Sequence, residues 1–190
     1  MGSHALARLI LYFAVRPDAA MHFRALHRHT KLGNRSLQQQ LAKLAEWGVV
    51  VREAADGTVT YRANSESPRW AALRELVRFF ADPAEVLGEA LADVGGIDAA
   101  FIFGSSARGE AREDSDVDMF ILGDALPAAQ LGRATSTAAI LLDREVDVKR
   151  FTRAKLERVL ENGDTGFARS ALEGPKRWVV GSASELAGIA

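Results

Sequence analysis

The stretch GSSARGEAREDSDVDMFIL, residues 104–122, places a Gly-Ser pair, a charged run, two closely spaced aspartates and an apolar segment in a row. Residues 98–103 before it are predicted to form a short strand, and residues 106–110 can form a helical turn. The Gly-Ser pair would then lie at a helix N-terminus, where free backbone N–H groups gather phosphate oxygens. Because glycine lets the backbone approach closely and serine adds a hydroxyl, we expect Gly104 and Ser105 to bind phosphate.

Asp116 and Asp118 stand where the apolar run of this stretch begins. Side chains alternate along a strand, so the two carboxylates are predicted to share a face, with their Cα atoms about 6.5–7 Å apart. Two carboxylates held this close repel each other unless a cation lies between them. Oxygen ligands of this kind suit Mg²⁺ or Mn²⁺, and we expect one of these ions here.

A third acid follows downstream, in the strand-like run REVDVKRF of residues 144–151. Alternation places Asp147 on the same face as Glu145 and Lys149, opposite two valines. Beside the first two aspartates, Asp147 would complete a triad of carboxylates. Such a triad can hold two metal ions about 3.5–4 Å apart, as phosphoryl-transfer sites do.

Each acid alone also has a plainer interpretation, because acidic side chains are mostly solvent-exposed. We interpret Glu110, Glu113 and Asp114 in this way, as charges of a solvated loop. Arg108 has two interpretations: it contacts a phosphate, or it balances these neighbouring acids.

The pattern of Gly104-Ser105, ten residues, Asp116-x-Asp118 and a later strand aspartate resembles the nucleotidyltransferase superfamily of DNA polymerase β. The stretch of residues 104–122 is most similar to the minimal nucleotidyltransferases, and the resemblance spans about residues 84–181. It implies transfer of a nucleoside monophosphate from an NTP, with ATP as the expected donor, to a hydroxyl group, with release of pyrophosphate.

The resemblance also implies a role for each residue. Asp116 and Asp118 would bind both metal ions, and Asp147 would bind the ion next to the acceptor oxygen. Gly104 and Ser105 would hold the β- and γ-phosphates. Members of the family often attach AMP to a helical toxin, so a protein partner such as a toxin is one acceptor that the resemblance suggests.

The N-terminal part of the chain differs from the rest in charge. Residues 1–70 hold 10 Lys and Arg against 5 Asp and Glu, which leaves 14 against 20 in residues 71–190. A basic front and an acidic back favour two modules with different partners.

Hydrophobic periodicity in the basic part indicates three helices, the third capped by Asn34, followed by two strands. Asp56-Gly57 between the strands is a strong hairpin signal. This order is that of a winged helix-turn-helix, and it resembles the DNA-reading half of small bacterial repressors of the ArsR and MarR kind over roughly residues 5–65. The predicted helices and strands span residues 5–15, 21–30, 34–47, 49–53 and 58–62.

A helix of this kind reads DNA through side chains that lie off its apolar stripe, and the hairpin touches phosphates. The plainer interpretation is a solvated helix face that docks a partner. The candidate DNA-binding residues are Arg35, Ser36, Gln38, Gln39 and Lys43 on the third helix and Arg52 and Arg62 on the hairpin.

The predicted fold class is α+β. A winged helix-turn-helix over residues 5–66 and a connecting helix over residues 67–83 precede a small polymerase-β-like nucleotidyltransferase domain over residues 84–190, with a mixed sheet and flanking helices. Further helices are predicted over residues 84–94, 152–162, 164–173 and 182–189, and a last strand over residues 176–181.

The function favoured by these patterns is a metal-dependent nucleotidyltransferase coupled to a DNA-binding module. The alternative is a winged-helix transcriptional regulator whose second domain binds or senses nucleotide without turnover. A homodimer is expected, because such DNA readers usually bind two-fold sites. The chain has no cysteine, and no apolar run approaches the roughly 20 residues that cross a bilayer, so we expect a cytoplasmic protein without membrane contact.

Overall fold

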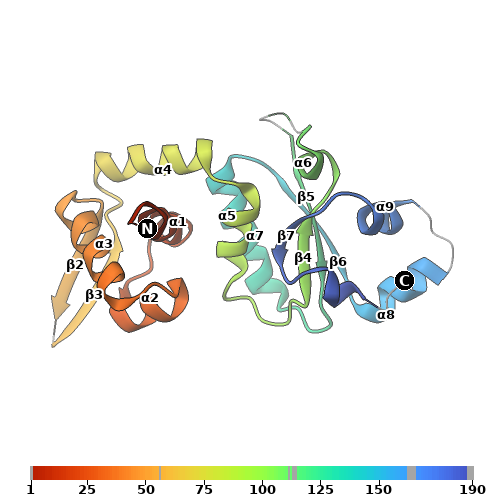
Figure 1. Ribbon diagram of the computed structural model, residues 1–190, viewed down its shortest axis with the longest axis horizontal. Coiled ribbons are helices and arrows are strands. Elements are labelled where there is room, and N and C mark those ends of the chain that lie inside the picture. Colours follow the sequence, from red (N-terminus) through yellow and green to blue (C-terminus); the bar gives the residue numbers. More distant parts are fainter. Residues whose placement is uncertain (1, 56, 111, 113–114, 162–165, 188–190) are drawn as a thin grey trace. The chain divides into compact units, whose positions relative to one another are not determined.

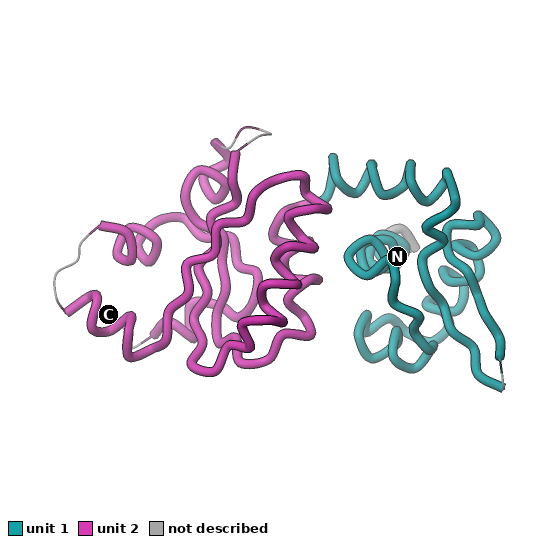
Figure 2. The backbone as a smooth tube through the Cα atoms, turned by 180° about the vertical axis from the view of Figure 1, so that it is seen from behind, with its two compact units in different colours: residues 1–81 teal, residues 82–190 magenta. Residues whose placement is uncertain are grey.

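The computed structural model divides the chain into two units, residues 1–81 and 82–190 (Figure 2). It describes residues 2–55, 57–110, 112, 115–161 and 166–187. None of the helices in these ranges is long and apolar enough to cross a membrane.

In the part of the first unit that the structure describes, four helices combine with a three-stranded antiparallel sheet of order β1-β3-β2 (Figure 1). Buried apolar side chains from α1, α2 and α3 form its core, among them Leu9, Phe13, Leu26, Leu41 and Leu44. The elements are α1 (Gly2–Val15), β1 (Met21–His22), α2 (Phe23–Thr30), α3 (Asn34–Glu46), β2 (Val50–Ala55), β3 (Thr58–Ala63) and α4 (Pro68–Phe80).

The second helix is shorter than its periodicity predicts. Met21 and His22 are extended and pair with Tyr61 and Thr60 of β3, so α2 begins only at Phe23. Pairing satisfies backbone groups of β3 that would otherwise lie at the sheet edge, and the sequence of residues 21–30 carries no sign of that distant partner.

Two details of the predicted turns can be compared with the structure. The N-cap of α3 is Gly33, and Asn34, expected as the cap, is instead the first helical residue. The β2–β3 hairpin closes where expected, with Ala55 opposite Thr58. Gly57 in its turn has φ +74°, a conformation that suits glycine, whereas Asp56 lies outside the described residues.

The predicted connecting helix starts as expected at Pro68, which occupies the first turn of α4. Trp70 is buried, and the whole helix belongs to the first unit.

The second unit contains a mixed four-stranded sheet of order β6-β5-β4-β7, as expected for the predicted domain. β5 and β6 are parallel, and the other two pairs are antiparallel. Figure 1 shows α5 and α7 on one face and α8 and α9 on the other. The elements are α5 (Pro83–Leu91), β4 (Ala99–Ile102), α6 (Gly104–Arg108), β5 (Val117–Leu122), α7 (Ala128–Leu142), β6 (Val146–Phe151), α8 (Arg153–Glu161), α9 (Phe167–Glu173), β7 (Arg177–Val180) and the 3₁₀ helix η1 (Ala183–Leu186).

Several of these bounds differ from the sequence prediction. Helix α7 occupies a part of the chain for which the sequence analysis predicts no element, and it covers the sheet with Leu131, Ala138, Leu141 and Leu142. The helix expected over residues 182–189 is only the short η1, with residues 188–190 outside the described part. The helix expected over residues 164–173 begins at Phe167 among the described residues.

A row of aromatic rings crosses the sheet on the face that α8 and α9 cover. Phe120 of β5 lies between Phe101 and Phe151, with ring centroids 4.8 Å and 4.9 Å away and interplanar angles of 12° and 11°. Leu122 and Leu156 complete this cluster. β5 is therefore buried on both faces, which fixes its position at the centre of the domain.

We predict that Phe120→Ala destabilises the second unit by about 3–5 kcal/mol, because it removes a fully buried ring and leaves a cavity. Urea unfolding followed by circular dichroism measures the change. Phe80→Ala is the matched control, since that ring is 83% exposed and its loss should change the unfolding free energy little. Equal effects of the two substitutions would contradict the assigned core.

Candidate active site

Gly104 forms a tight corner between β4 and α6. Its φ is +69°, and a Cβ atom at this position would lie 2.7 Å from Oδ2 of Asp118. The backbone N–H of Phe103 donates to the carbonyl oxygen of Asp118 across 3.1 Å. Glycine is therefore required twice at this corner, by the backbone conformation and by the approach of the carboxylate.

Asp118 and Asp147 lie side by side on neighbouring strands. β5 and β6 run parallel with these two residues as direct partners, so both side chains leave the same face of the sheet. Asp116 lies just before β5 and is exposed, whereas Asp118 and Asp147 are half-buried.

The three acids act on one another electrostatically. Burial first, and then the negative charges of Asp147 and Asp116, raise the pKa of Asp118 above its ordinary value of 3.8. The cation Lys149 opposes this effect but does not cancel it. Asp118 and Asp147 thus lie together, Asp118 lies beside the Gly104 corner, and Asp116 is near enough to act on Asp118 electrostatically.

The chemistry of these donors fits a divalent cation, because Mg²⁺ and Mn²⁺ take carboxylate oxygens. The geometry fits it in part: within the ranges that the structure describes, no three His, Asp or Glu side chains form a ready-made metal group. Oδ2 of Asp147 is also 2.8 Å from Nζ of Lys149, so this carboxylate already has a cationic partner. This contact also raises the pKa of Lys149.

Ser105 and Arg108 occupy different surroundings. Ser105 is half-buried in the first turn of α6. Arg108 is exposed, and its Nε lies 2.6 Å from Oε2 of Glu110, which is the acid-balancing arrangement. A phosphate contact by either residue stays a prediction, and Glu113 and Asp114 lie outside the described residues.

Arg144 is a site residue that the sequence analysis missed. Its Nε donates to the carbonyl oxygen of Ser115 at 2.5 Å, and its Nη2 donates to the hydroxyl of Ser106 at 3.1 Å and to the carbonyl oxygen of Asp116 at 3.4 Å. The guanidinium therefore holds the segment that carries Asp116 against α6. No local pattern points to this residue, because its partners are 28 to 38 positions away in the chain.

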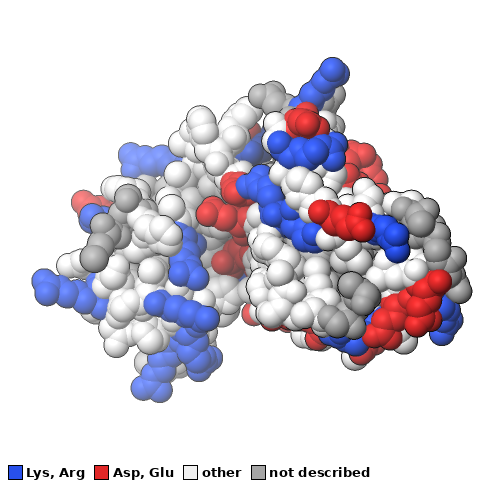
Figure 3. Space-filling model, turned by 45° about the vertical axis from the view of Figure 1, so that its right-hand side comes forward, with Lys and Arg blue, Asp and Glu red and all other residues white. Residues whose placement is uncertain are grey.

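The DNA-binding candidates on α3 are largely where the sequence predicts an open face. Ser36 is half-buried. On the face drawn in Figure 3, the first unit carries mainly Lys and Arg, whereas the second carries both signs. The exposed candidates on this helix are Arg35, Gln38, Gln39 and Lys43.

The two hairpin arginines do not act together. Arg52 pairs with Tyr61 across the hairpin and Arg62 pairs with Val51, so they lie on opposite faces. Nε of Arg62 is also 3.0 Å from Oε1 of Glu53, which neutralises part of its charge. Arg52 is exposed and is the better placed of the two for a phosphate.

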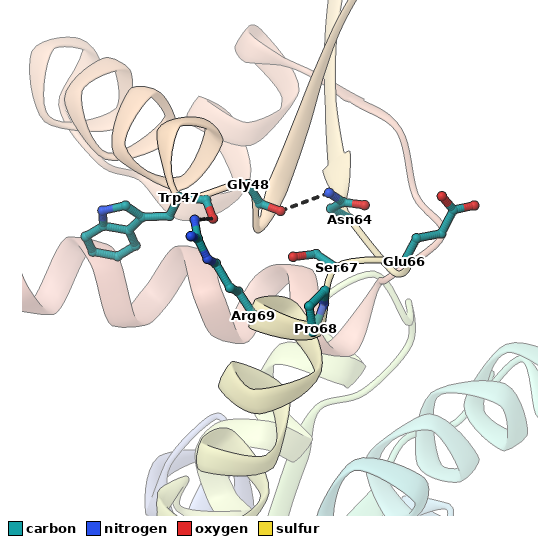
Figure 4. Close-up of a pocket in the computed structure, with 7 residues that line it drawn as sticks. All are labelled: Trp47, Gly48, Asn64, Glu66, Ser67, Pro68 and Arg69. Carbon is teal, nitrogen blue, oxygen red and sulfur yellow. Dashed lines mark hydrogen bonds between the residues drawn. The ribbon is translucent and has the colours of Figure 1, made fainter.

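A cleft of about 420 Å³ lies between the end of α3 and the start of α4 (Figure 4). Asn64 donates to the carbonyl oxygen of Gly48 at 2.9 Å, and Arg69 donates to that of Trp47 at 3.1 Å. Carbonyls at a helix C-terminus need such partners, so these polar side chains have a structural task in joining α3 to α4.

We predict that Asp118→Asn raises the melting temperature at pH 7 without added divalent cation by about 2 °C, a small shift because solvent screens a half-exposed charge. Because the pKa of Asp118 is raised in the folded protein, ionisation of this side chain opposes folding. The contribution of Asp118 to the free energy of unfolding is therefore fully present below its ordinary pKa and is lost as the pH rises through its pKa in the folded protein. The gain in the variant should therefore disappear as the pH falls toward 4.

Differential scanning calorimetry between pH 4 and 8 gives this comparison. Asp124→Asn is the matched control, because Asp124 is exposed beyond the other end of β5 and its side chain accepts from the backbone of Arg153, a role that asparagine keeps. A lower melting temperature for Asp118→Asn at pH 7 would contradict the repulsion between the acids.

Comparison with known proteins gives one family match. Residues 85–165 match the family described as polymerase beta, nucleotidyltransferase. A solved structure described as "Crystal structure of the toxin-antitoxin with AMP-PNP" shares 17% identity, with a TM-score of 0.37, over 55% of this chain and 77% of that chain, a likeness too low to add to the assignment. No curated protein matches the sequence. The matched residues 85–165 contain the Gly104 corner and the paired aspartates of β5 and β6, so this part of the chain is similar to the polymerase beta nucleotidyltransferase family.

Proposed function

We propose that the second unit transfers a nucleoside monophosphate from an NTP, with ATP as the expected donor, to a hydroxyl acceptor. The observation that carries this proposal is the position of Asp118, which lies in register with Asp147 and against the backbone of Gly104. Carboxylates therefore lie next to a turn from strand to helix, where backbone N–H groups can bind phosphate oxygens. Both kinds of group are needed to position a triphosphate.

In the reaction, the acceptor oxygen attacks the α-phosphorus and forms a new P–O bond. The bond from the α-phosphorus to the bridging oxygen breaks, and pyrophosphate leaves with the electron pair. The hydroxyl proton passes to the carboxylate of Asp147. Backbone N–H groups of Gly104 and Ser105 orient the β- and γ-phosphates, so the protein contributes mainly positioning and electrostatic stabilisation.

A divalent cation, Mg²⁺ or Mn²⁺, would be held by Asp116 and Asp118, of which Asp118 lies against Gly104. When bound, it supplies positive charge to the phosphate oxygens and lowers the pKa of an acceptor hydroxyl. Arg144 keeps the backbone of Asp116 in place for this task.

We predict that Asp116→Asn and Asp118→Asn each reduce nucleotidyl transfer at least about 100-fold, because each removes a charge that positions the reacting groups. The assay incubates the full chain with NTP labelled at the α-phosphate, Mg²⁺ and cell lysate, and follows label in macromolecules. Asp124→Asn should retain wild-type transfer. Full activity in either site variant would overturn the assignment of these acids.

The proposal also concerns which molecule accepts the nucleotide and whether the site turns the nucleotide over. A protein acceptor such as a toxin partner follows from the resemblance to minimal nucleotidyltransferases. The alternative function is a regulator that binds or senses nucleotide without turnover, and it would be favoured by saturable NTP binding with no label transferred in the same assay.

We also propose that the first unit binds DNA as a winged helix. The support is the order α1-α2-α3 followed by the β2–β3 hairpin, together with the exposed polar face of α3 that carries Arg35 and Lys43. An exposed helix fits the major groove, and its side chains reach base edges. A homodimer on a two-fold DNA site is part of this proposal and stays a prediction.

We predict that the double substitution Arg35→Ala with Lys43→Ala weakens binding to a 30-base-pair duplex about 5-fold or more at low salt. It should also reduce the magnitude of the slope of log affinity against log salt concentration by about 1 to 2. Binding releases counterions from each phosphate that the protein contacts, and the variant makes fewer such contacts. Fluorescence anisotropy at several salt concentrations measures both. Arg8→Ala on α1, also exposed, is the control and should have little effect. Equal weakening by the control would contradict the role of α3.

A further inference from the structure

Lys149 lies on the acid-bearing face of the sheet. It follows Asp147 by two residues on β6, so both side chains leave the same face. Its Nζ is 2.8 Å from Oδ2 of Asp147, and the two side chains are 42% and 43% exposed. Nζ also lies 5.9 Å from the centre of the Phe167 ring, a second contact that favours a cation at this point.

This ammonium group lies where it would repel a second metal ion bound to Asp147. A divalent ion bound to Oδ2 of Asp147 at about 2.1 Å would lie no more than about 5 Å from Nζ of Lys149. Like charges at that separation repel strongly in a partly desolvated site. A second ion can therefore bind Asp147 only if Lys149 leaves it.

The charges of the site lead to the same conclusion. Asp116, Asp118 and Asp147 carry three negative charges, and Lys149, charged at neutral pH, removes one of them. One divalent ion balances the remainder on the protein, before the negative charge of a triphosphate is added. A lysine ammonium is a compact charge with three donors, so it can hold Asp147 and still donate to an oxygen of the substrate.

We propose that the ammonium group of Lys149 takes the place of the acceptor-side metal ion, so that the site works with a single divalent ion held by Asp116 and Asp118. This inference rests on the proposed nucleotidyl transfer and changes its metal requirement. Lys149 is then the fixed positive charge beside the acceptor oxygen, and Asp147 both positions it and takes the hydroxyl proton.

The test counts Mn²⁺ ions bound per full-length chain by electron paramagnetic resonance. The probe is Mn²⁺ with an ATP analogue that has a methylene group between the α- and β-phosphorus atoms, and only ions on analogue that stays free in solution are subtracted. The wild-type chain should bind one ion. Lys149→Met should bind two, the second at least about 10-fold more tightly than any second ion in the wild type.

Lys149→Arg keeps the positive charge and should still bind one ion, and Lys149→Gln should behave as Lys149→Met does if the methionine variant does not fold. Lys155→Met, an exposed lysine on α8 with Nζ 5.2 Å from the Phe151 ring, is the matched control and should bind one ion.

Two ions in the wild type, or one ion in both neutral variants, would overturn the assignment of Lys149. Asp118→Asn separates this result from the proposed function: if that variant still binds Mn²⁺ as the wild type does, the acid site itself is wrong. Loss of Mn²⁺ in Asp118→Asn with an unchanged count in the lysine variants leaves the acid site intact and rejects only the lysine.

Discussion

The direct pairing of Asp118 with Asp147 is the constraint on which the rest of the second unit depends. Parallel strands hold partner residues about 4.8 Å apart, so this register forces two carboxylates together on one face. The half-buried position of Asp118 makes the repulsion larger and raises its pKa. A chain selected only for stability would not keep this pair, which is why a concentration of like charge on rigid strands indicates a site for a cationic or metal-bound ligand.

The surrounding structure offsets this unfavourable pair. Beyond Asp118 on the same face, Phe120 stacks between Phe101 and Phe151, and α8 and α9 cover the rings. The strand is thus held by apolar burial along most of its length, while the side chain of Asp118 near its start remains partly exposed. Arg144 adds a polar brace, because it bonds to the two backbone carbonyls just before β5 and to Ser106 of α6. Rigid elements supported by a second layer of contacts are what a site for phosphoryl chemistry requires.

The two units show different electrostatic arrangements. In the first, exposed Arg35 and Lys43 on α3 have solvent around them, whereas Arg62 of the hairpin is paired with Glu53. In the second, the positive charge at the site is placed against a specific carboxylate, as Lys149 is against Asp147. A spread of accessible cations suits a polyanion such as DNA, and a fixed cation suits one atom of a small substrate.

The local patterns of the sequence determined much of this protein by themselves. Alternation placed Asp147 and Lys149 on one face, and the Gly-Ser pair marked the corner where α6 begins. These predictions held because they depend on neighbours within a few residues, where backbone geometry decides the outcome. The α+β class followed from the same local signals, whereas the mixed sheet was implied by the resemblance of residues 84–181 to the polymerase β superfamily. The tertiary structure alone decided which strands are partners. It set Asp147 beside Asp118, extended Met21 and His22 along β3, brought Arg144 to the loop before β5 and added α7 over the sheet. Each of these contacts joins residues distant in sequence or depends on burial against another element, and no periodicity within a segment encodes the identity of a remote partner.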